Sequence, residues 1–310
     1  MEVIRMNRFR KSVTLLMVLA VMLGLFSFAA AAEGAPIAEN LELRTYRGVS
    51  VGGQLSATDP DGSALRFVVS TKPVKGELEL EEDGHFVYTP GDGKRGKDYF
   101  GYQAIDADGN RSQEATVIIR IEKQKSKVTY ADLGGSGSAY AACRLAEEGL
   151  FCGEYLAGRY VFDPDRAVTR EEFLAMCMQL SGTGILTGVR STGFADDRSI
   201  AVWAKPYVST ALKNGVISGY TGEGGATFAP ERSISVAEAA VMLDRAIGLT
   251  DAVSAWSATD SAVPVWAAQS AANLSACGLL PYGCSLTAET LSRAQCAEML
   301  SGAMDVLARR

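Results

Sequence analysis

Four aspartates in two similar turn motifs could bind a metal ion. Asp59 and Asp61 lie in the sequence D-P-D-G, and Asp106 and Asp108 lie in D-A-D-G. Carboxylate oxygens are the ligands that calcium prefers, so four such side chains gathered at one end of a domain would form a calcium site. The alternative is that both motifs are turns, in which the aspartates accept hydrogen bonds from their own backbone. Calcium is the only cofactor that the sequence suggests.

The sequence offers only one histidine that could serve as the base in nucleophilic catalysis. His85 is the single histidine of the chain and stands next to an Asp-Gly turn, which predicts a surface position. One histidine leaves no Ser-His-Asp or Cys-His arrangement in place. Glu172 and Glu238 fall at helix-capping positions, and nothing pairs them as the acid and base of a glycoside hydrolase. We therefore expect a protein that is not an enzyme.

Residues 1–32 have the composition of a signal peptide. Basic residues come first, an apolar run from 14 to 28 follows, and four alanines end the segment. The apolar run is too short for a comfortable membrane span, and an uncleaved anchor is the alternative. Cleavage removes four basic residues and one acidic residue, which lowers the formal net charge from −6 to −9. We expect an exported protein with no membrane partner once it is processed.

The acidic composition restricts the partners. The sequence shows no basic stripe for phosphate contacts, so nucleic acid is not expected as a partner. At long range the negative field would also repel any anionic polymer, so binding of such a polymer would depend on local cationic groups.

Residues 33–122 are predicted to form an all-β domain. Seven runs of alternating apolar residues recur between turns, at 41–43, 49–51, 65–69, 78–80, 86–88, 99–105 and 115–121. Short strands at this spacing predict an immunoglobulin-like sandwich. The stretch from DPDGSALRFVVS to GNRSQEATVIIRI resembles the bacterial cadherin-like, immunoglobulin-like modules of secreted surface proteins. The charged residues 123–128 that follow are expected to be a linker that acts as a hinge between two independently folding parts.

The rest of the chain is Ala-rich and contains one helical unit in three copies. The clearest copy begins FADDRSIAVWAKPYVSTALKNGVISGY and continues TGEGGATFAPERSISVAEAAVMLDRAIGL. It predicts a helical hairpin: a helix ended by Gly215, a Gly-rich loop, and a second helix that starts at a capping box of Ser235 and Glu238. Degenerate copies with turn glycines at Gly149 and Gly278 flank it. The copies span residues 129–183, 192–249 and 255–308.

This unit resembles the S-layer homology (SLH) repeat, whose pattern is F-x-D, W-A, G-I-I-x-G-Y, F-x-P and T-R-A-E. The resemblance implies an all-α bundle of three repeats with pseudo-threefold symmetry. It also implies that grooves between neighbouring repeats hold secondary cell-wall polysaccharide, often pyruvylated. The carboxylate of a pyruvyl ketal suits the planar fork of an arginine that follows a helix cap. A tryptophan at the mouth of a groove offers a flat apolar face to a sugar ring.

The resemblance assigns the polysaccharide-binding residues: Arg170 and Arg293 from T-R-A-E, Trp203 and Trp266 from W-A, and Asp132 and Asp196 from F-x-D. The aspartates are expected to shape a loop or to bond sugar hydroxyls. Surface ion pairs are the alternative for the arginines, and core packing is the alternative for the tryptophans. Val236 replaces the cation in the second copy, Gly137 replaces the tryptophan in the first, and the third lacks the F-x-P loop. At most two working grooves are therefore expected.

Six cysteines fall into the first and third copies, three in each. An even number in an exported chain favours disulfides, and full pairing would need at least one bond between the two copies. The sequence does not select a pairing, and reduced, buried thiols are the alternative. No C-x-x-C spacing supports a zinc site. The disulfide candidates are Cys143, Cys152, Cys177, Cys277, Cys284 and Cys296.

We therefore predict a multidomain, non-catalytic protein of the cell wall or S-layer, anchored through secondary cell-wall polysaccharide. Its β domain would act as a spacer or as an adhesive domain for an unknown surface ligand. One alternative is a binding module for calcium, a glycan or a protein, whose degenerate repeats serve protein–protein packing. A second alternative is an accessory subunit of a wall-associated enzyme.

Overall fold

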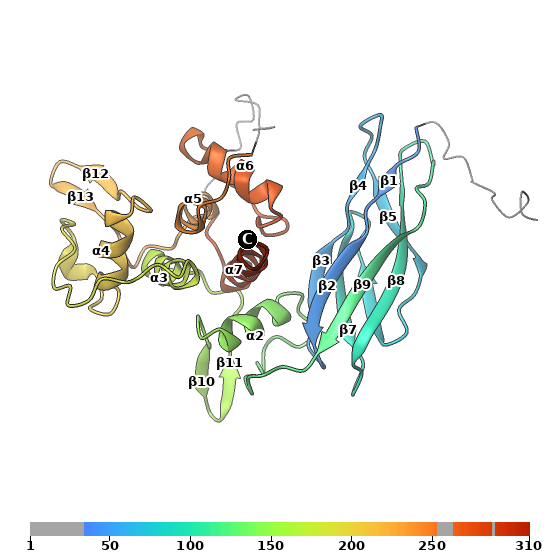
Figure 1. Ribbon diagram of the computed structural model, residues 1–310, viewed down its shortest axis with the longest axis horizontal. Coiled ribbons are helices and arrows are strands. Elements are labelled where there is room, and N and C mark those ends of the chain that lie inside the picture. Colours follow the sequence, from blue (N-terminus) through green and yellow to red (C-terminus); the bar gives the residue numbers. More distant parts are fainter. Residues whose placement is uncertain (1–33, 253–262, 287–288) are drawn as a thin grey trace, which may run out of the picture.

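The computed structural model describes residues 34–252, 263–286 and 289–310 as an all-β part followed by a helical part (Figure 1). The predicted signal peptide and the first residues of the third predicted copy, 255–262, lie outside the described residues. Within the described residues, no helix is long and apolar enough to cross a membrane.

The β part consists of two main sheets. The strands are β1 (Ile37–Ala38), β2 (Leu41–Tyr46), β3 (Val51–Gln54), β4 (Ala57–Thr58), β5 (Arg66–Thr71), β6 (Gly76–Leu80), β7 (His85–Pro90), β8 (Gly96–Ile105) and β9 (Ala115–Glu122). One sheet has the order β2-β9-β8-β5, the other has the order β3-β7-β6, and β1 pairs with β4. Six of the seven predicted strands coincide with observed ones, the run predicted at 49–51 overlaps β3 only at Val51, and the two-residue strands β1 and β4 are additional. The fold agrees with an immunoglobulin-like or cadherin-like domain.

The two sheets enclose one apolar core. Along β9, alternate residues point inward, so Val117 and Ile119 are fully buried while their neighbours are half-exposed. Aromatic rings fill the centre, where Phe86 and Phe100 meet edge to face at 5.2 Å between centroids.

In its described residues, the helical part contains three long α-helices, three shorter ones, two 3-10 helices and two small hairpins. Its elements are α2 (Ala139–Glu147), β10 (Glu154–Leu156), β11 (Arg159–Val161), α3 (Arg170–Leu180), η1 (Asp197–Ser199), α4 (Lys205–Lys213), β12 (Tyr220–Gly222), β13 (Gly225–Thr227), α5 (Val236–Ile247), η2 (Val265–Ala267), α6 (Ala268–Ala276) and α7 (Arg293–Ala308). Each of α3, α5 and α7 begins with a capping box, at Thr169, Ser235 and Ser292. The glycines that follow α2, α4 and α6 have positive φ, which ends each helix. The capping box predicted at Ser235 and Glu238 is confirmed.

The segments that precede the three long helices are joined in pairs. Isolated β-bridges link Thr169 to Ser233, Ser235 to Thr290, and Ala167 to Ser292. Figure 1 shows α3, α5 and α7 nearly end-on in the middle, with α2, α4 and α6 around them. One apolar core runs through all six helices.

The predicted hairpin packing is wrong in one respect. The short helix of a unit packs against the long helix of the preceding unit, so α4 contacts α3, α6 contacts α5, and α2 contacts α7. The loop and small hairpin that follow each of α2 and α4 carry the chain around to the next position before the long helix begins. The units are thus interleaved, and the helical part cannot separate into independent hairpins.

The segment after β9, expected to be a hinge, is held in place. The carboxylate of Glu147 on α2 accepts hydrogen bonds from the backbone N–H groups of Lys125 and Ser126, the latter at 3.1 Å. The same carboxylate accepts from the hydroxyl of Tyr46 on β2 at 2.8 Å. The side chain of Glu147 on α2 thus binds both the β part and the segment that follows it. The interpretation of this segment as a free hinge does not hold.

Candidate functional site

A cleft of about 390 Å³ opens where three segments of the helical part meet. We call it the Arg170 cleft. Its lining residues are Arg170 from the start of α3, 216–220 from the turn after α4, Glu238, Val241, Met242 and Arg245 from α5, and Trp266 from η2. Each predicted copy therefore contributes a different part of the wall.

Arg170 is fixed inside this cleft by polar and aromatic contacts. Only 4% of its surface is exposed. Its Nε donates to the carbonyl of Phe228 at 2.9 Å, and Nη1 lies 3.3 Å from Oε2 of Glu238. The guanidinium carbon lies 4.6 Å from the ring centre of Tyr220 and 5.3 Å from that of Phe228. Its Nη2 has no hydrogen-bond or ion-pair partner among the described residues, so one donor remains for a ligand rather than a complete fork.

Charge in the Arg170 cleft is positive on balance. Glu238 also receives hydrogen bonds from Arg232 and from the hydroxyl of Tyr220. Burial opposes its ionisation, but the hydrogen bonds from Arg232 and the Ser235 N–H, together with the charge of Arg170, lower the pKa of Glu238. One carboxylate thus faces two arginines. Arg245, exposed on the same face of α5, has no ion-pair partner in the described part of the chain.

The sequence analysis missed Arg245. Glu238, Val241, Met242 and Arg245 follow the spacing i, i+3, i+4 and i+7, which places them on one face of a helix. That spacing, counted from the predicted capping glutamate, was the signal that could have found it.

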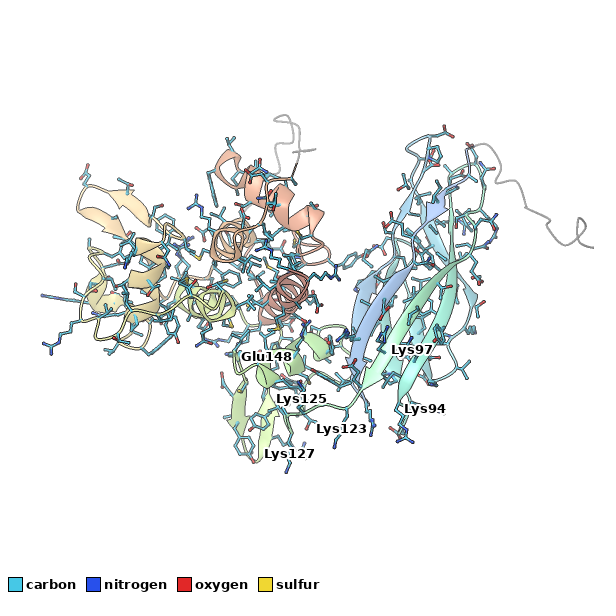
Figure 2. All side chains as sticks on the ribbon, in the orientation of Figure 1. Lys94, Lys97, Lys123, Lys125, Lys127 and Glu148 are labelled. Atoms are coloured by element: carbon cyan, nitrogen blue, oxygen red, sulfur yellow. The ribbon has the colours of Figure 1, made fainter. Side chains whose placement is uncertain are left out.

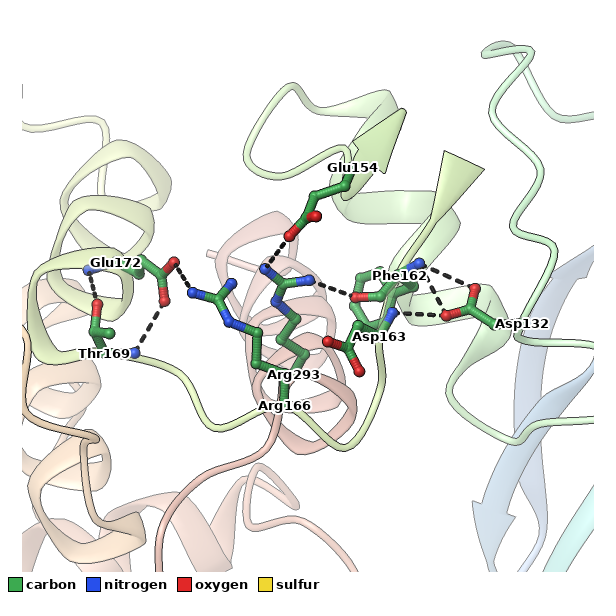
Figure 3. Close-up of polar contacts among 8 residues, drawn as sticks. All are labelled: Asp132, Glu154, Phe162, Asp163, Arg166, Thr169, Glu172 and Arg293. Carbon is green, nitrogen blue, oxygen red and sulfur yellow. Dashed lines mark hydrogen bonds and ion pairs between the residues drawn. The ribbon is translucent and has the colours of Figure 1, made fainter. Parts of the chain in front are cut away.

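Arg293 occupies the corresponding position at the start of α7 and is buried, and Figure 3 shows its contacts with Phe162 and Glu154. Its Nη1 donates to the carbonyl of Phe162 at 2.8 Å, and Nη2 lies 3.3 Å from Glu154. The remaining space beside it is about 20 Å³. A water molecule needs roughly 10–15 Å³ by this kind of measure, so a sugar ring does not fit. The ring centre of Phe151 lies 4.9 Å from the guanidinium carbon, so this ring occupies much of the space beside Arg293.

The third corresponding position has no cation. Val236 stands at the start of α5 in place of an arginine and is fully buried. Gly137 stands in place of a tryptophan, and its carbonyl accepts a hydrogen bond from Gly52 of β3 at 2.8 Å. Nearby, Tyr282 stacks on His85 of the β part at 4.1 Å between ring centroids. The β part therefore contacts the helical part on this side.

Asp132 and Asp196 accept hydrogen bonds from the backbone of a loop. This is the first of the two roles expected for them, shaping a loop or binding sugar hydroxyls. Asp196 accepts from the N–H groups of Phe228 and Ala229 at 2.9 and 2.7 Å. Asp132 accepts in the same way from Phe162 and Asp163, at 2.7–3.1 Å (Figure 3). Neither aspartate lines the Arg170 cleft.

The two tryptophans are both exposed, Trp203 by 52% and Trp266 by 59%. Trp266 lines the Arg170 cleft, whereas Trp203 lines neither this cleft nor the space beside Arg293. Of the six residues assigned to polysaccharide binding, the structure thus brings Arg170 and Trp266 together.

The expected calcium cluster is not formed. Asp59 accepts from the N–H of Ser63 at 2.6 Å, and Asp106 accepts from the N–H and side-chain amide of Asn110 at 2.8 and 2.9 Å. These are the turn contacts of the alternative interpretation. Asp61 and Asp108 are exposed. No group of three or more His, Cys, Asp or Glu residues in the described ranges is arranged to hold a metal ion.

All six cysteines are free thiols in the structure, so the expected disulfides are not formed. Cys143, Cys177 and Cys296 are buried in the helical core, where they pack as small apolar residues. Burial raises the pKa of Cys143 to about 11 and that of Cys177 well above its ordinary value. Cys152 and Cys277 are exposed on separate segments.

Two family models match this architecture. Residues 33–123 match the bacterial cadherin-like domain, and residues 193–240 match the S-layer homology domain. The chain therefore carries a bacterial cadherin-like domain and an S-layer homology domain. Both domain types are typical of non-catalytic anchoring proteins, and the matches indicate a location at the cell surface.

Three curated relatives resemble part of the chain. A surface-layer 125 kDa protein of Lysinibacillus sphaericus is 29% identical over 47% of this chain and 13% of its own length. A cellulosome-anchoring protein of Acetivibrio thermocellus is 30% identical over 40% of this chain and 27% of its own length. An amylopullulanase of Thermoanaerobacterium thermosulfurigenes is 35% identical over 43% of this chain and only 7% of its own length. The chain thus spans about a quarter or less of the relatives that it matches.

Proposed function

We propose that the helical part anchors this protein to a secondary cell-wall polysaccharide bound in the Arg170 cleft. The β part would then project as a spacer or adhesive domain. The observation that carries this proposal is the convergence of Arg170, Glu238 and Trp266, from three copies, on one cleft. Its volume of about 390 Å³ lies within the range of roughly 300–1,000 Å³ that ligand pockets usually have.

The helical part is taken to be three SLH repeats around a pseudo-threefold axis. Three β-bridges join the segments before α3, α5 and α7 in a closed triangle. Each short helix also contacts the long helix of the preceding unit, in a cycle that returns from α2 to α7. Both relations repeat three times, which supports a closed bundle rather than a row of hairpins.

The chemistry of the cleft suits a sugar that bears a carboxylate, such as a pyruvyl ketal. Arg245 and Nη2 of Arg170 offer cationic donors without partners in the described residues, and Trp266 offers an exposed ring face. Because Arg293 is enclosed and Val236 replaces the third arginine, we expect one working groove in this chain.

The test compares two double variants of the chain that lacks residues 1–32. Trp266→Ala with Arg245→Gln removes the ring and the unpaired cation from the cleft. Trp203→Ala with Arg198→Gln makes the same chemical changes at exposed positions outside it. Each is sedimented with wall sacculi that retain their secondary polysaccharide and with sacculi stripped of it.

We expect the wild type and the Trp203/Arg198 variant to sediment only with unstripped sacculi. The Trp266/Arg245 variant should stay in the supernatant. Equal sedimentation of both variants would show that the Arg170 cleft does not bind the polysaccharide. If the wild type sediments with neither kind of sacculi, the result supports the alternative in which the repeats bind protein.

A further inference from the structure

Five of the ten lysines of the chain gather along one edge of the molecule. This basic edge consists of Lys94, Lys97, Lys123, Lys125 and Lys127, which Figure 2 labels from the end of the β part to the first helical unit. Strand pairing explains the gathering, because Gly96 at the start of β8 pairs with Ile121 near the end of β9. Lys94, just before β8, and Lys97, near its start, therefore lie at the same end of the sheet as the lysines that follow β9. The linear sequence shows no basic stripe; the fold makes one.

The charges of the basic edge are not neutralised within the chain. All five lysines are exposed, and none is in an ion pair among the described residues. Glu148 lies on the same edge, and Asp92 and Glu122 are close in sequence. Two further acids are nearby: Glu42, near Lys97, is paired with Arg120, and Glu147 accepts hydrogen bonds from the backbone N–H groups of Lys125 and Ser126. Positive charge therefore remains in excess at this edge of an acidic protein.

A cleft of about 490 Å³ continues the basic edge onto the β10–β11 hairpin. Its lining includes Lys127, Arg159 and the aromatic residues Tyr130, Tyr155 and Tyr160. Tyr155 is 65% exposed, and its ring meets that of Tyr160 at 4.9 Å between centroids. The cleft shares no lining residue with the Arg170 cleft. An open tyrosine face beside two cations is suited to a sugar ring that carries a negative group.

We propose that the basic edge and this tyrosine cleft form a second binding site, for a carboxylate-bearing or phosphate-bearing polysaccharide of the wall. The exposed lysines supply the local cations that an acidic protein needs to approach a polyanion. A polysaccharide is favoured over nucleic acid because the matched families indicate the cell surface. It is favoured over a lipid surface because the aromatic residues line a concave cleft rather than a projecting apolar face. This site is independent of the Arg170 cleft.

The test measures binding of polygalacturonate oligomers by the chain without residues 1–32. All proteins carry Trp266→Ala with Arg245→Gln, so that the Arg170 cleft does not contribute. Lys125→Gln with Lys127→Gln should weaken binding at least about tenfold and reduce its dependence on salt. Lys72→Gln with Lys213→Gln, which removes the same charge at exposed positions elsewhere, should leave binding within about twofold. Tyr155→Ala should weaken binding, and Tyr155→Phe, which keeps the ring, should restore it.

Dextran, single-stranded DNA and phosphatidylglycerol vesicles are the comparison ligands. Weak or absent binding of all three supports the assignment to an acidic polysaccharide. If dextran, which is uncharged, binds as tightly as polygalacturonate, charge does not control binding and the proposal fails. Tighter binding of DNA or of vesicles would overturn the assignment to a polysaccharide. Equal losses in the two lysine pairs would show that net charge, and not this edge, controls binding.

Discussion

Arg170 is a buried cation that the fold positions without a ligand. Burial, the largest effect, lowers its pKa, although the charge of Glu238 acts in the opposite direction. The contacts to Phe228 and Tyr220 hold the guanidinium plane, so a ligand meets a donor that is already oriented. Pre-orientation of this kind reduces the entropy lost on binding.

Arg170→Lys should therefore destabilise the protein even without ligand. The ammonium group keeps the charge but cannot reach Glu238 and the Phe228 carbonyl from one plane. We expect the free energy of unfolding to fall by about 1–3 kcal/mol, since a buried acceptor loses its donor. Urea denaturation measures the change, and Arg198→Lys, at an exposed arginine, is the control. Equal stability of both variants would contradict a positioning role for Arg170.

Glu298 on α7 makes the stability depend on pH. Burial raises its pKa from 4.5 to about 7. The folded protein therefore keeps a proton that the unfolded chain releases, so the free energy of unfolding falls as the pH rises from about 4.5 to about 7. Glu298→Gln removes this loss and should be more stable than the wild type at pH 8, by on the order of 2 kcal/mol.

Thermal melting at pH 4 and pH 8 checks this expectation. At pH 4 both the folded and unfolded wild type hold the proton, so the variant should melt with the wild type. Glu148→Gln, at an exposed acid, is the matched control. A variant that differs from the wild type by the same amount at both values would show an effect of packing rather than of charge.

At the scale of elements, the F-x-P loops connect the predicted motifs. The residue between the aromatic residue and the proline, Asp163 or Ala229, has φ of 57° or 55°, a conformation that costs roughly 1–2 kcal/mol for residues other than glycine. The carboxylates of Asp132 and Asp196 hold these strained positions through two backbone N–H groups each. The Phe228 carbonyl that this loop presents then accepts from Arg170.

Asp196→Ala should thus affect both stability and binding. Loss of a charged acceptor for two N–H groups is expected to cost about 2–4 kcal/mol of unfolding free energy. Polymer binding in the Arg170 cleft should also weaken, because the loop that orients Arg170 is released. Asp196→Asn keeps one oxygen acceptor and should lose less of both. Denaturation and wall sedimentation measure the two effects, and a loss of binding without a loss of stability would point instead to direct contact of Asp196 with the sugar.

Local chemistry was readable from the sequence, whereas partners distant in the chain were not. The capping box at Ser235, the turn at Gly215 and six of the seven predicted β strands are present, and each depends on neighbouring residues. The packing of α4 on α3 depends on the path of a loop, and the enclosure of Arg293 depends on the bulk of Phe151. Conserved spacing could suggest that two arginines occupy like positions, but not that only one has space beside it.

At the scale of the molecule, the β part takes up the side where the third groove would lie. Val49 of the β part packs on the helical core, and Tyr140 of α2 packs on the β core. At Gly137, a Cβ atom would lie 3.2 Å from the Cα of Gly52. The glycine in place of tryptophan therefore allows the two backbones to meet. A tryptophan side chain at position 137 would clash with β3, so the glycine found there is compatible with this docking of the β part on the helical part.

Gly137→Trp tests this docking. The indole cannot fit against Gly52, so the contact between β3 and the start of α2 should break while both cores remain intact. Small-angle scattering of the chain without residues 1–32 should then show a larger radius of gyration, and heating should show two transitions in place of a shared one. Gly134→Trp is the matched control, because a Cβ atom there meets nothing within 4 Å. If both variants scatter like the wild type, the angle between the parts does not depend on this contact.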